Sequence, residues 1–340
     1  MEKSLAYKDV YLVPKFSSLR SRSMANLETE FLGRKFTGCW IPSNMKSAID
    51  KKIAYWLSEN NYFYIYHRFN DTLNFVKNSQ TYFEGDKFFG NPIWNLISIS
   101  IGVKQEDKEL LQKIIDYRLR VDFITIDVAH GHHLLVKEMI EYIKNLSLYP
   151  NPFPRPKIIA GNVATPEAVI DLQNWGADAV KIGIAGGAVC STKNMTGFHV
   201  PMFSCVLECA KVAKVPLIAD GGIRENGDIS KALVSGADMV MIGGILASCI
   251  DSPAENIFDP SRSSNLTKPF ISHKRFFGSA SFRNKGHNQH VEGFELDIPC
   301  NQMTYAEKYQ EIRESLQSAI SYSGGTNLKS FHNTKYIILK

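Results

Sequence analysis

The sequence has few cysteines, and none of them are paired at the spacing of a metal site. Its 340 residues contain six, too few for a disulfide framework and without the Cys-X-X-Cys pair of a structural zinc site. There is no apolar run of about 18 residues and no signal-peptide pattern at the N-terminus. We therefore predict a cytoplasmic protein with no membrane partner. The six thiols are Cys39, Cys190, Cys205, Cys209, Cys249 and Cys300.

The sequence also lacks a strong charge of either sign. Lys and Arg number 39 against 34 Asp and Glu, giving a net charge of +5. This weak, evenly spread excess argues against a nucleic-acid partner but suits phosphorylated ligands. Hydrophobic residues make up 44% and charged residues 21%, which is ordinary globular composition. The length allows two small domains or one large one, and an α/β barrel takes about 250 residues.

Short apolar runs alternate with amphipathic stretches. Several runs, such as FITID, LIAD and MVMIG, are continuously apolar, as in a parallel sheet that is covered on both faces. Eight such units predict a (β/α)8 TIM barrel; the alternative is a doubly wound open sheet. We predict strands at 39–41, 62–66, 95–101, 122–127, 157–161, 179–183, 216–220 and 239–243, and helices at 106–118, 133–146, 166–175, 203–213 and 229–235.

The alternation fails in three places. Residues 1–38 form an N-terminal arm, 252–300 interrupt the pattern after the last strand, and 326–340 form a C-terminal tail. A long irregular segment after a barrel strand lies on the face where barrel active sites are built, so we interpret 252–300 as a mobile flap. The whole chain, 1–340, is then a single catalytic domain without a regulatory tandem domain.

Glycines follow the last two predicted strands. Asp220-Gly221-Gly222 ends one strand and Gly243-Gly244 ends the next. Phosphate-binding barrels place an anion site of backbone N–H groups at this position, and glycine allows the close approach it needs. The alternative is that these glycines only form tight turns.

Cys190 is the most informative thiol. It lies in a glycine-rich loop that leaves a strand, with Lys193 nearby, a setting that can activate a cysteine nucleophile. Cys205 and Cys209, four residues apart on an apolar helix face, are more typical of a core. The run His130-Gly131-His132-His133 could hold a metal, but it lacks a set of acidic or thiol partners.

Ordered motifs give the chain a family resemblance. It resembles the compact bacterial type of GMP reductase, within the IMP dehydrogenase/GMP reductase family, from about residue 8 to near the C-terminus. The matching segments are NNYFYIYHRF (60–69), ITIDVAHGH (124–132), IAGNVATPEAV (159–169), GADAVKIGI (176–184), IADGGIRENGDISKAL (218–233), GADMVMIG (236–243), FFGSAS (276–281), VEG (291–293) and ISYSGGTNL (320–328).

The resemblance implies reduction of GMP to IMP and ammonia with NADPH, as part of purine interconversion. Cys190 would attack C2 of guanine to form a thioimidate, while Thr192 and Glu292 would assist departure of the amine. The resemblance implies further substrate contacts from Asp220, Gly221, Gly222, Gly243, Gly244, Ser279, Ser281 and Gly293. It implies cofactor contacts from His67, Asp127, Val128, Ala129, Ile184 and Ala185.

The resemblance also implies a bound monovalent cation such as K⁺ and a homotetramer. The cation would be held by the carbonyls of Ala185, Gly187 and Cys190. The family loop reads Gly-x-Gly-Pro-Gly, and here it is Gly183 to Gly187 with Ala185 inside, which cannot take every conformation open to glycine. The sequence also departs from the usual family sequence between Met195 and Pro201.

Two alternatives have different chemistry. IMP dehydrogenase shares the barrel and the cysteine but oxidises IMP with NAD, using an Arg-Tyr pair on its flap. No Arg-Tyr dipeptide occurs in 252–300, and residues 68–94 leave no room for inserted modules of about 50 residues. The other alternative is a purine-nucleotide-binding barrel without turnover.

Overall fold

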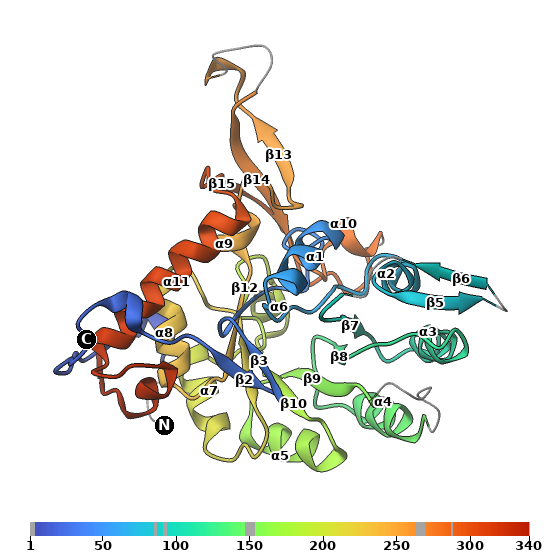
Figure 1. The fold of residues 1–340 in the computed structure, drawn as a ribbon, viewed down its shortest axis with the longest axis horizontal. Helices are drawn as coiled ribbons and strands as arrows, with labels where there is room; N and C mark the ends of the chain where they lie inside the picture. Colours follow the sequence, from blue (N-terminus) through green and yellow to red (C-terminus); the bar gives the residue numbers. More distant parts are fainter. Residues whose placement is uncertain are drawn as a thin grey trace.

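The computed structural model describes residues 4–84, 87–90, 94–146, 154–262, 269–286 and 288–339, so parts of the predicted arm, flap and tail lie outside it. One sheet in the described chain has seven parallel strands, in the order β4-β12-β11-β10-β9-β8-β7 (Figure 1). Because the last strand of the series, β12, pairs with the first, β4, the sheet curls as in a TIM-barrel-like domain. The strands are β4 (Trp40–Pro42), β7 (Ser98–Ile101), β8 (Phe123–Asp127), β9 (Lys157–Val163), β10 (Ala179–Ile182), β11 (Leu217–Asp220) and β12 (Met239–Ile242).

Helices follow the strands, which confirms the predicted α/β alternation. The predicted start of α5 is confirmed: the Thr165 side chain accepts a hydrogen bond from the Ala168 N–H at 3.3 Å, and Pro166 opens the first turn. Gly176 and Gly236 follow the predicted helices 166–175 and 229–235 and have φ of 108° and 109°, a left-handed conformation that commonly ends a helix. The helices are α1 (Lys51–Glu59), α2 (Thr72–Asn78), α3 (Gln105–Asp116), α4 (Leu134–Asn145), α5 (Pro166–Trp175), α6 (Thr192–Thr196), α7 (Met202–Ala210), α8 (Asn226–Val234), α9 (Gly244–Ala247), α10 (Phe282–Lys285) and α11 (Tyr305–Tyr322).

The predicted strand at 62–66 is wrong in extent. Only Tyr66 pairs with the sheet: its N–H donates to the Ser98 carbonyl at 3.0 Å, and its own carbonyl accepts from Ser100 at 2.9 Å. The rest of the run is held through side chains, because the Tyr64 hydroxyl donates to the Leu96 carbonyl at 2.8 Å and Phe63 packs on neighbouring rings. Aromatic packing therefore replaces a hydrogen-bonded ladder here.

Helix α11 was not predicted, although its sequence carries a start signal. Thr304 and Glu307 form a reciprocal capping box at its first turn. The rings of Tyr305 and Tyr309 lie on one face of the helix, and Tyr309 packs against Trp40 of β4 with centroids 5.8 Å apart. The Tyr305 hydroxyl donates to the Ala48 carbonyl at 2.7 Å. Helix α11 thus covers the edge where β12 meets β4.

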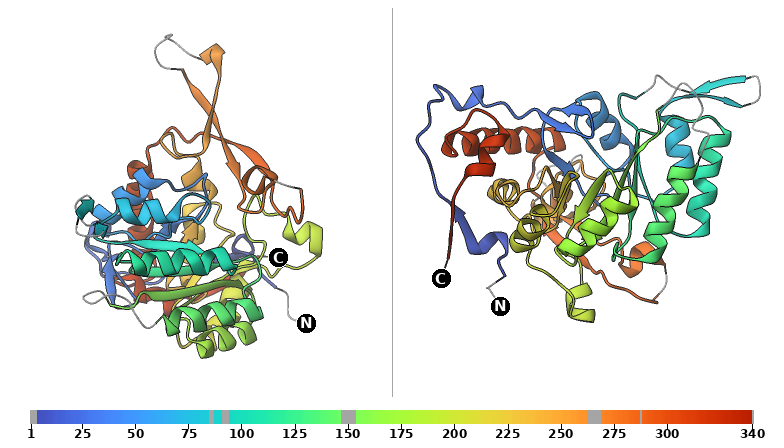
Figure 2. Two further views of the ribbon diagram at one scale, coloured as in Figure 1. Left: turned by 90° about the vertical axis from the view of Figure 1, so that its right-hand side faces the viewer. Right: turned by 90° about the horizontal axis from the view of Figure 1, so that it is seen from below.

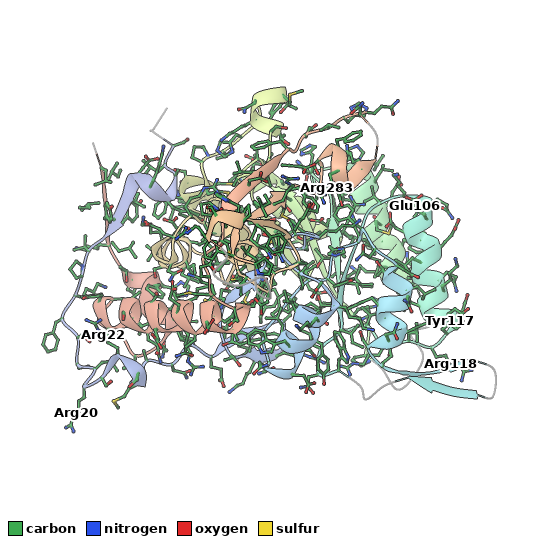
Figure 3. The ribbon with its side chains drawn as sticks, turned by 90° about the horizontal axis from the view of Figure 1, so that it is seen from above. Arg20, Arg22, Glu106, Tyr117, Arg118 and Arg283 are labelled. Atoms are coloured by element: carbon green, nitrogen blue, oxygen red, sulfur yellow. The ribbon has the colours of Figure 1, made fainter. Side chains whose placement is uncertain are left out.

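Residues 252–300 hold regular structure where the sequence indicated an irregular segment. Strands β13 (Glu255–Phe258), β14 (Ile271–Phe277) and β15 (Glu295–Pro299) form an antiparallel sheet, which projects away from the rest of the molecule (Figure 1). Charged pairs take the place of apolar alternation: Arg275 meets Asp297 at 2.9 Å, and Arg283 of α10 meets Glu255 at 2.6 Å. Figure 3 shows Arg283 far from Arg20 and Arg22 of the N-terminal arm.

A buried lysine fixes the base of this projecting sheet. Lys274 of β14 is almost completely buried, and its ammonium group donates to the Ser252 carbonyl at 3.1 Å and to Asn256 Oδ1 at 2.5 Å. Burial lowers the pKa of Lys274. The three-stranded sheet is therefore tied to the end of the barrel-like sheet through neutral oxygens.

The N-terminal arm and the C-terminal tail pair with each other. Strand β1 (Val10–Leu12) is antiparallel to β16 (Tyr336–Ile338), which places both chain ends on one side of the molecule (Figure 2).

The remaining short strands form two hairpins, β2 (Thr29–Phe31) with β3 (Arg34–Phe36), and β5 (Thr81–Glu84) with β6 (Lys87–Gly90). Four 3₁₀ turns are η1 (Tyr7–Asp9), η2 (Arg22–Met24), η3 (Pro260–Arg262) and η4 (Leu328–Asn333). No helix of the described chain is both long and apolar enough to cross a bilayer.

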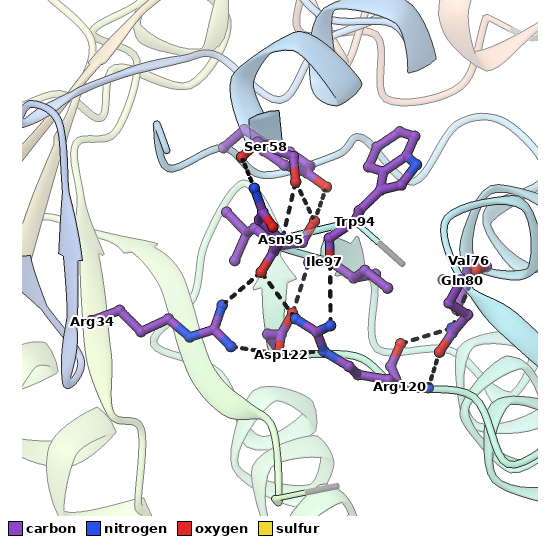
Figure 4. A network of polar contacts seen from close by, with 11 residues as sticks. Arg34, Ser58, Val76, Gln80, Trp94, Asn95, Ile97, Arg120 and Asp122 are labelled. Atoms are coloured by element: carbon purple, nitrogen blue, oxygen red, sulfur yellow. Dashed lines mark hydrogen bonds and ion pairs between the residues drawn. The ribbon is translucent and has the colours of Figure 1, made fainter. Parts of the chain in front are cut away.

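A polar network closes the amino-terminal end of the sheet (Figure 4). Asp122, which directly precedes β8, contacts Arg34 at 2.9 Å and Arg120 at 2.8 Å. Its second oxygen also accepts from the Ile97 N–H at 2.8 Å. Arg120 donates in addition to the carbonyls of Trp94 and Asn95. These groups join the arm hairpin, β7 and β8 at the end of the sheet opposite the predicted site.

Candidate functional site

A cavity of about 720 Å³ lies at the carboxyl ends of the parallel strands, and most of the predicted site residues line it. A second, more open hollow of about 740 Å³ lies beside α1 and α2, but no predicted site residue or thiol lines it. The first cavity is therefore the candidate site. The predicted residues that line it are Asp127, Val128, Ala129, Ile184, Ala185, Gly187, Cys190, Thr192, Asp220, Gly221, Gly222, Gly243, Gly244, Ser279, Glu292 and Gly293.

Cys190, Thr192 and Glu292 form one hydrogen-bonded chain. The Cys190 thiol donates to Thr192 Oγ1 at 3.2 Å, and the Thr192 hydroxyl donates to Glu292 Oε2 at 2.6 Å. The first two residues flank the start of α6, whereas Glu292 comes from the segment between α10 and β15. This arrangement gives a nucleophile a path along which its proton can reach a carboxylate.

Backbone pairing holds these two segments together. Cys190 forms an antiparallel β-bridge with Gly293, and Ser281 forms a parallel one with the same residue. The Ser191 N–H donates to the Glu292 carbonyl at 2.9 Å. A Cβ on Gly293 would stand 2.9 Å from the Ser281 nitrogen, so only glycine allows the three backbones to lie this close. The pairing therefore sets the position of Glu292 relative to Thr192.

Lys181 is a buried cation between two carboxylates of the cavity wall. It projects from β10, and its ammonium group lies 2.9 Å from Asp127 at the end of β8 and 2.7 Å from Asp220 at the end of β11. Burial alone would lower the pKa of Lys181, but the two carboxylates raise it above its usual value. Burial would likewise raise the pKa of Asp127, but Lys181 lowers it below its usual range. Lys181 and Asp127 therefore stay charged near neutral pH.

Asn162 reaches this cluster through an irregularity in the sheet. The register between β9 and β10 pairs Lys181 with Gly161 and Ile182 with Val163, so Asn162 is an extra residue. Bulges of this kind re-aim a side chain. The Asn162 side-chain amide donates to Asp220 Oδ2 at 2.8 Å and to the Gly183 carbonyl at 2.7 Å.

The glycines at the strand ends bring two loops into contact. Gly221 has a φ of 110°, and a Cβ there would stand 2.8 Å from the Gly186 carbonyl carbon. The Gly222 N–H donates to the Gly186 carbonyl at 2.9 Å. Gly243 stands at the start of α9 with Gly244 beside it. Gly221 and Gly222 therefore pack the loop before Cys190 onto the end of β11. Gly243 and Gly244 line the same cavity.

Two predicted residues do not line the cavity. His67 is 1% exposed and stacks on Tyr66, and burial together with Lys46 lowers its pKa to about 4. Ser281, also 1% exposed, caps α10 by accepting a hydrogen bond from the Asn284 N–H. The backbone after His67 still enters the wall, because the cavity is lined by Arg68 and Phe69.

The sequence places Arg68 just after a predicted strand, where it could contact an anionic cofactor, but the prediction missed four other cavity cations. Lys104, Lys181, Arg224 and Lys285 line the cavity along with Arg68. The guanidinium of Arg68 lies over the Phe69 ring, 4.7 Å from its centroid, and its charge contributes to lowering the pKa of Asp127. Lys181 had a usable signal, since a lone lysine inside the apolar strand AVKI needs a buried partner. Lys104 and Arg224 lie in loops and Lys285 ends α10, and no spacing pattern marks these three.

In the predicted cation-binding loop, Ala185 adopts a left-handed backbone conformation that favours glycine over alanine. Ala185 has a φ of 59°, a left-handed conformation that costs a non-glycine residue roughly 1 kcal/mol. The Gly187 carbonyl accepts from the Cys190 N–H at 3.3 Å, which leaves one of its lone pairs for another partner. The loop is therefore compatible with carbonyl coordination of a monovalent cation.

The histidine run serves other roles. His132 pairs with Asp171 at 2.8 Å, and His133 caps α4. In the part of the chain that the structure describes, no group of three or more His, Cys, Asp or Glu could hold a metal ion. All six cysteines are free, and Cys190 is the only one of them that is not buried.

A thiol beside a hydroxyl–carboxylate pair, in a glycine-rich cavity at the strand ends of a TIM-barrel-like sheet, defines a class of nucleophilic α/β enzyme. The family model described as "IMP dehydrogenase / GMP reductase domain" matches residues 4–339. The chain therefore belongs to the IMP dehydrogenase/GMP reductase family.

Similar curated proteins agree with this family. The chain is 41% identical over 336 residues to a protein named GMP reductase from Delftia acidovorans, covering 98% of this chain and 95% of that one. It is 41% identical over 339 residues to a GMP reductase from Oenococcus oeni (98% and 96%). A GMP reductase from Mesoplasma florum is 40% identical over 337 residues (98% and 97%).

Proposed function

We propose that this chain is a GMP reductase that converts GMP to IMP and ammonia at the expense of NADPH. The observation that carries the proposal is the chain of hydrogen bonds from Cys190 through Thr192 to Glu292 on the cavity wall. The names of relatives at 40–41% identity support the same reaction.

The direction of the hydrogen bonds supports an order of proton movements. Glu292 takes the thiol proton through Thr192 as Cys190 Sγ bonds to C2 of the guanine ring. The same proton returns through Thr192 to the 2-amino group, the C2–N2 bond breaks, and ammonia leaves a thioimidate on Cys190. A poor electrophile such as C2 needs both a strong nucleophile and a protonated leaving group.

NADPH, when bound, supplies the hydride that reduces C2 and releases IMP as the Cys190 thiolate departs. Asp127, Val128 and Ala129 are proposed to hold it, because they line the cavity beside the cations Arg68 and Lys104. The carbonyls of Ala185, Gly187 and Cys190 are proposed to hold K⁺. Glu292 and its neighbours line the cavity, and in this proposal their segment closes over the substrate and keeps water from hydrolysing the thioimidate.

The remaining architecture is proposed in the same way. Tyr66 would take the eighth strand position of a (β/α)8 barrel, since it bridges to Ile99 of β7. Residues 252–300 would be a mobile flap on a single catalytic domain without a tandem module, and the subunits would form a homotetramer. The six free thiols support a reducing, cytoplasmic setting.

The test is an assay of the purified protein with GMP and NADPH, following the loss of NADPH absorbance and the formation of IMP. Cys190→Ala should lose at least about 1,000-fold in kcat while still binding GMP. Cys300→Ala is the matched control, because Cys300 is buried and does not line the cavity, and it should keep wild-type activity. Full activity in Cys190→Ala would overturn the mechanism.

Two other results would replace the proposal. NADH formation from IMP and NAD, without turnover of GMP, would make the chain an IMP dehydrogenase. Tight GMP binding with neither reaction would make it a nucleotide-binding barrel without turnover.

A further inference from the structure

The segment that carries Cys190 and Thr192 folds back to its own beginning. It leaves β10 at Gly183 and continues through Cys190 into α6. Gly197, with a φ of 78°, then ends α6 in the left-handed conformation and reverses the chain. Its N–H donates to the Lys193 carbonyl at 3.1 Å, which fixes the reversal. As a result, residue 199 lies beside residue 184.

His199 joins these two ends. Its ring nitrogen Nδ1 lies 2.8 Å from the Ile184 carbonyl oxygen. A carbonyl oxygen only accepts, so Nδ1 carries the hydrogen and donates it. The Ile184 carbonyl shares one planar peptide unit with the nitrogen of Ala185. Fixing the direction of this carbonyl therefore fixes φ of Ala185, which is 59°.

The contact lies between two other anchors of the same loop. The Gly183 carbonyl accepts from the Asn162 side chain at 2.7 Å, and the Gly186 carbonyl accepts from the Gly222 N–H at 2.9 Å. Both anchors hold peptide units that glycine's freedom makes easy to orient. The unit between Ile184 and Ala185 has no such freedom, because alanine disfavours the left-handed region.

We propose that His199 is a positioning residue that holds Ala185 in its left-handed conformation and so keeps Cys190 in line with Thr192. This inference rests on the proposed function for its kinetic readout. Without the imidazole, Ala185 relaxes toward a negative φ, the peptide plane turns, and the thiol loses its alignment. Small displacements of a reacting atom are costly to turnover. The effect falls on kcat, because the glycines at the ends of β11 and β12 keep their positions.

The first experiment compares His199→Ala, His199→Asn and Phe198→Ala. His199→Ala should lower kcat about 10-fold and leave KM for GMP within about twofold. Asparagine presents an amide N–H near the place of Nδ1, so His199→Asn should recover kcat to within about threefold of wild type. Phe198 is 74% exposed, and Phe198→Ala is the control with wild-type kinetics. A kcat within twofold of wild type for His199→Ala, or no recovery with Asn, would overturn the proposal.

A double-mutant cycle tests the route through Ala185. Glycine holds φ near +60° without help. The loss of kcat on His199→Ala should therefore shrink from about 10-fold to about threefold or less when Ala185→Gly is already present. An equal loss in both backgrounds would show that His199 does not act through the conformation of Ala185.

Hydrogen exchange separates this proposal from the proposed function. Amide exchange at residues 183–191 of the protein without substrate should become at least about fivefold faster in His199→Ala and stay near wild type in His199→Asn. This holds even if wild-type protein fails to reduce GMP, in which case only the proposed function falls. Unchanged exchange in His199→Ala would overturn the positioning role.

Discussion

The two ends of the parallel sheet each hold a network of three charged side chains around a buried central group, with opposite composition. At the carboxyl end, one cation, Lys181, lies between Asp127 and Asp220. At the amino end, one anion, Asp122, lies between Arg34 and Arg120. Both networks join segments that are distant in the sequence, and the first one lines the cavity of the candidate site.

The two networks differ in what the outer residues, two arginines at one end and two aspartates at the other, contact beyond the central group. The two arginines donate onward to backbone carbonyls of residues 94 and 95, so that their N–H groups bind the protein itself. Asp127 and Asp220 instead keep 15% and 20% of their side chains exposed at the cavity. The same kind of interaction therefore joins backbone segments at one end and leaves carboxylate oxygens facing the cavity at the other. This agrees with barrels, in which the carboxyl end carries function and the amino end stability.

Removing the central cation should have the largest effect. Lys181→Met leaves two carboxylates side by side without a counter-ion, so the free energy of unfolding should fall by about 3–5 kcal/mol. Because both carboxylates line the cavity, kcat/KM should also fall at least about 100-fold. Urea unfolding and the GMP assay measure the two effects. Intact activity in a folded Lys181→Met would remove the distinction between the two ends.

Removing the central anion should cost stability alone. Asp122→Ala leaves two arginines unpaired, and since Arg34 is partly exposed, we expect a loss of about 3 kcal/mol at most. The folded fraction at low temperature should keep kcat/KM within about twofold, because this network lies opposite the cavity. A large kinetic defect with normal stability would show that the amino end also serves the reaction.

Lowering the pH should reduce the free energy of unfolding by a smaller amount, through His67 at the carboxyl end of the sheet. His67 is buried in its neutral form, with a pKa lowered from 6.5 to about 4. Between these values the unfolded chain binds a proton that the folded chain does not, so stability falls as pH falls through this window. The loss should reach about 2 kcal/mol at pH 5. Melting temperatures of wild type and His67→Gln should therefore converge from pH 7 to pH 5, and parallel curves would contradict this account.

The smallest effect is expected at Ala185. Ala185→Gly relieves the left-handed strain but gives the unfolded chain more freedom, so the net gain in unfolding free energy should be no more than about 1 kcal/mol. The matched variant at the amino end is Arg118→Gly, because the exposed residue Arg118 has a φ of 52° between α3 and β8. Denaturant midpoints should rise in both. A lower midpoint in Ala185→Gly alone would show that the methyl group contributes packing that outweighs the strain.

The parallel strands and five of the helices could be predicted because buried strands are continuously apolar and helix caps are local. The 252–300 segment could not, since its sheet is held by ion pairs such as Arg275 with Asp297 rather than by an apolar face. Helix α11 was missed despite the capping box at Thr304 and apolar residues at helical spacing. The run at 62–66 shows the opposite error, because it was predicted as a strand but packs through its aromatic rings and pairs with the sheet only at Tyr66.

The candidate site was predicted from motifs and not from distances. Cys190, Thr192 and Glu292 belong to segments about one hundred residues apart, and only the folded chain shows the 2.6 Å contact between the last two. Lys181 and Asn162 escaped because their roles depend on burial and on a register shift between β9 and β10. The role proposed for His199 could not be predicted because its hydrogen-bond partner is a backbone carbonyl, which has no sequence signature.

The bridge between Cys190 and Gly293 joins the loop that carries the thiol to the segment that carries Glu292. Glu292 lies between α10 and β15, whereas Thr192 begins α6. If the proposed flap moves away from the barrel-like sheet, the Thr192–Glu292 hydrogen bond must break. In the proposed mechanism the Cys190 thiol then has no carboxylate to accept its proton, so the nucleophile is activated only while this segment lies against the cavity.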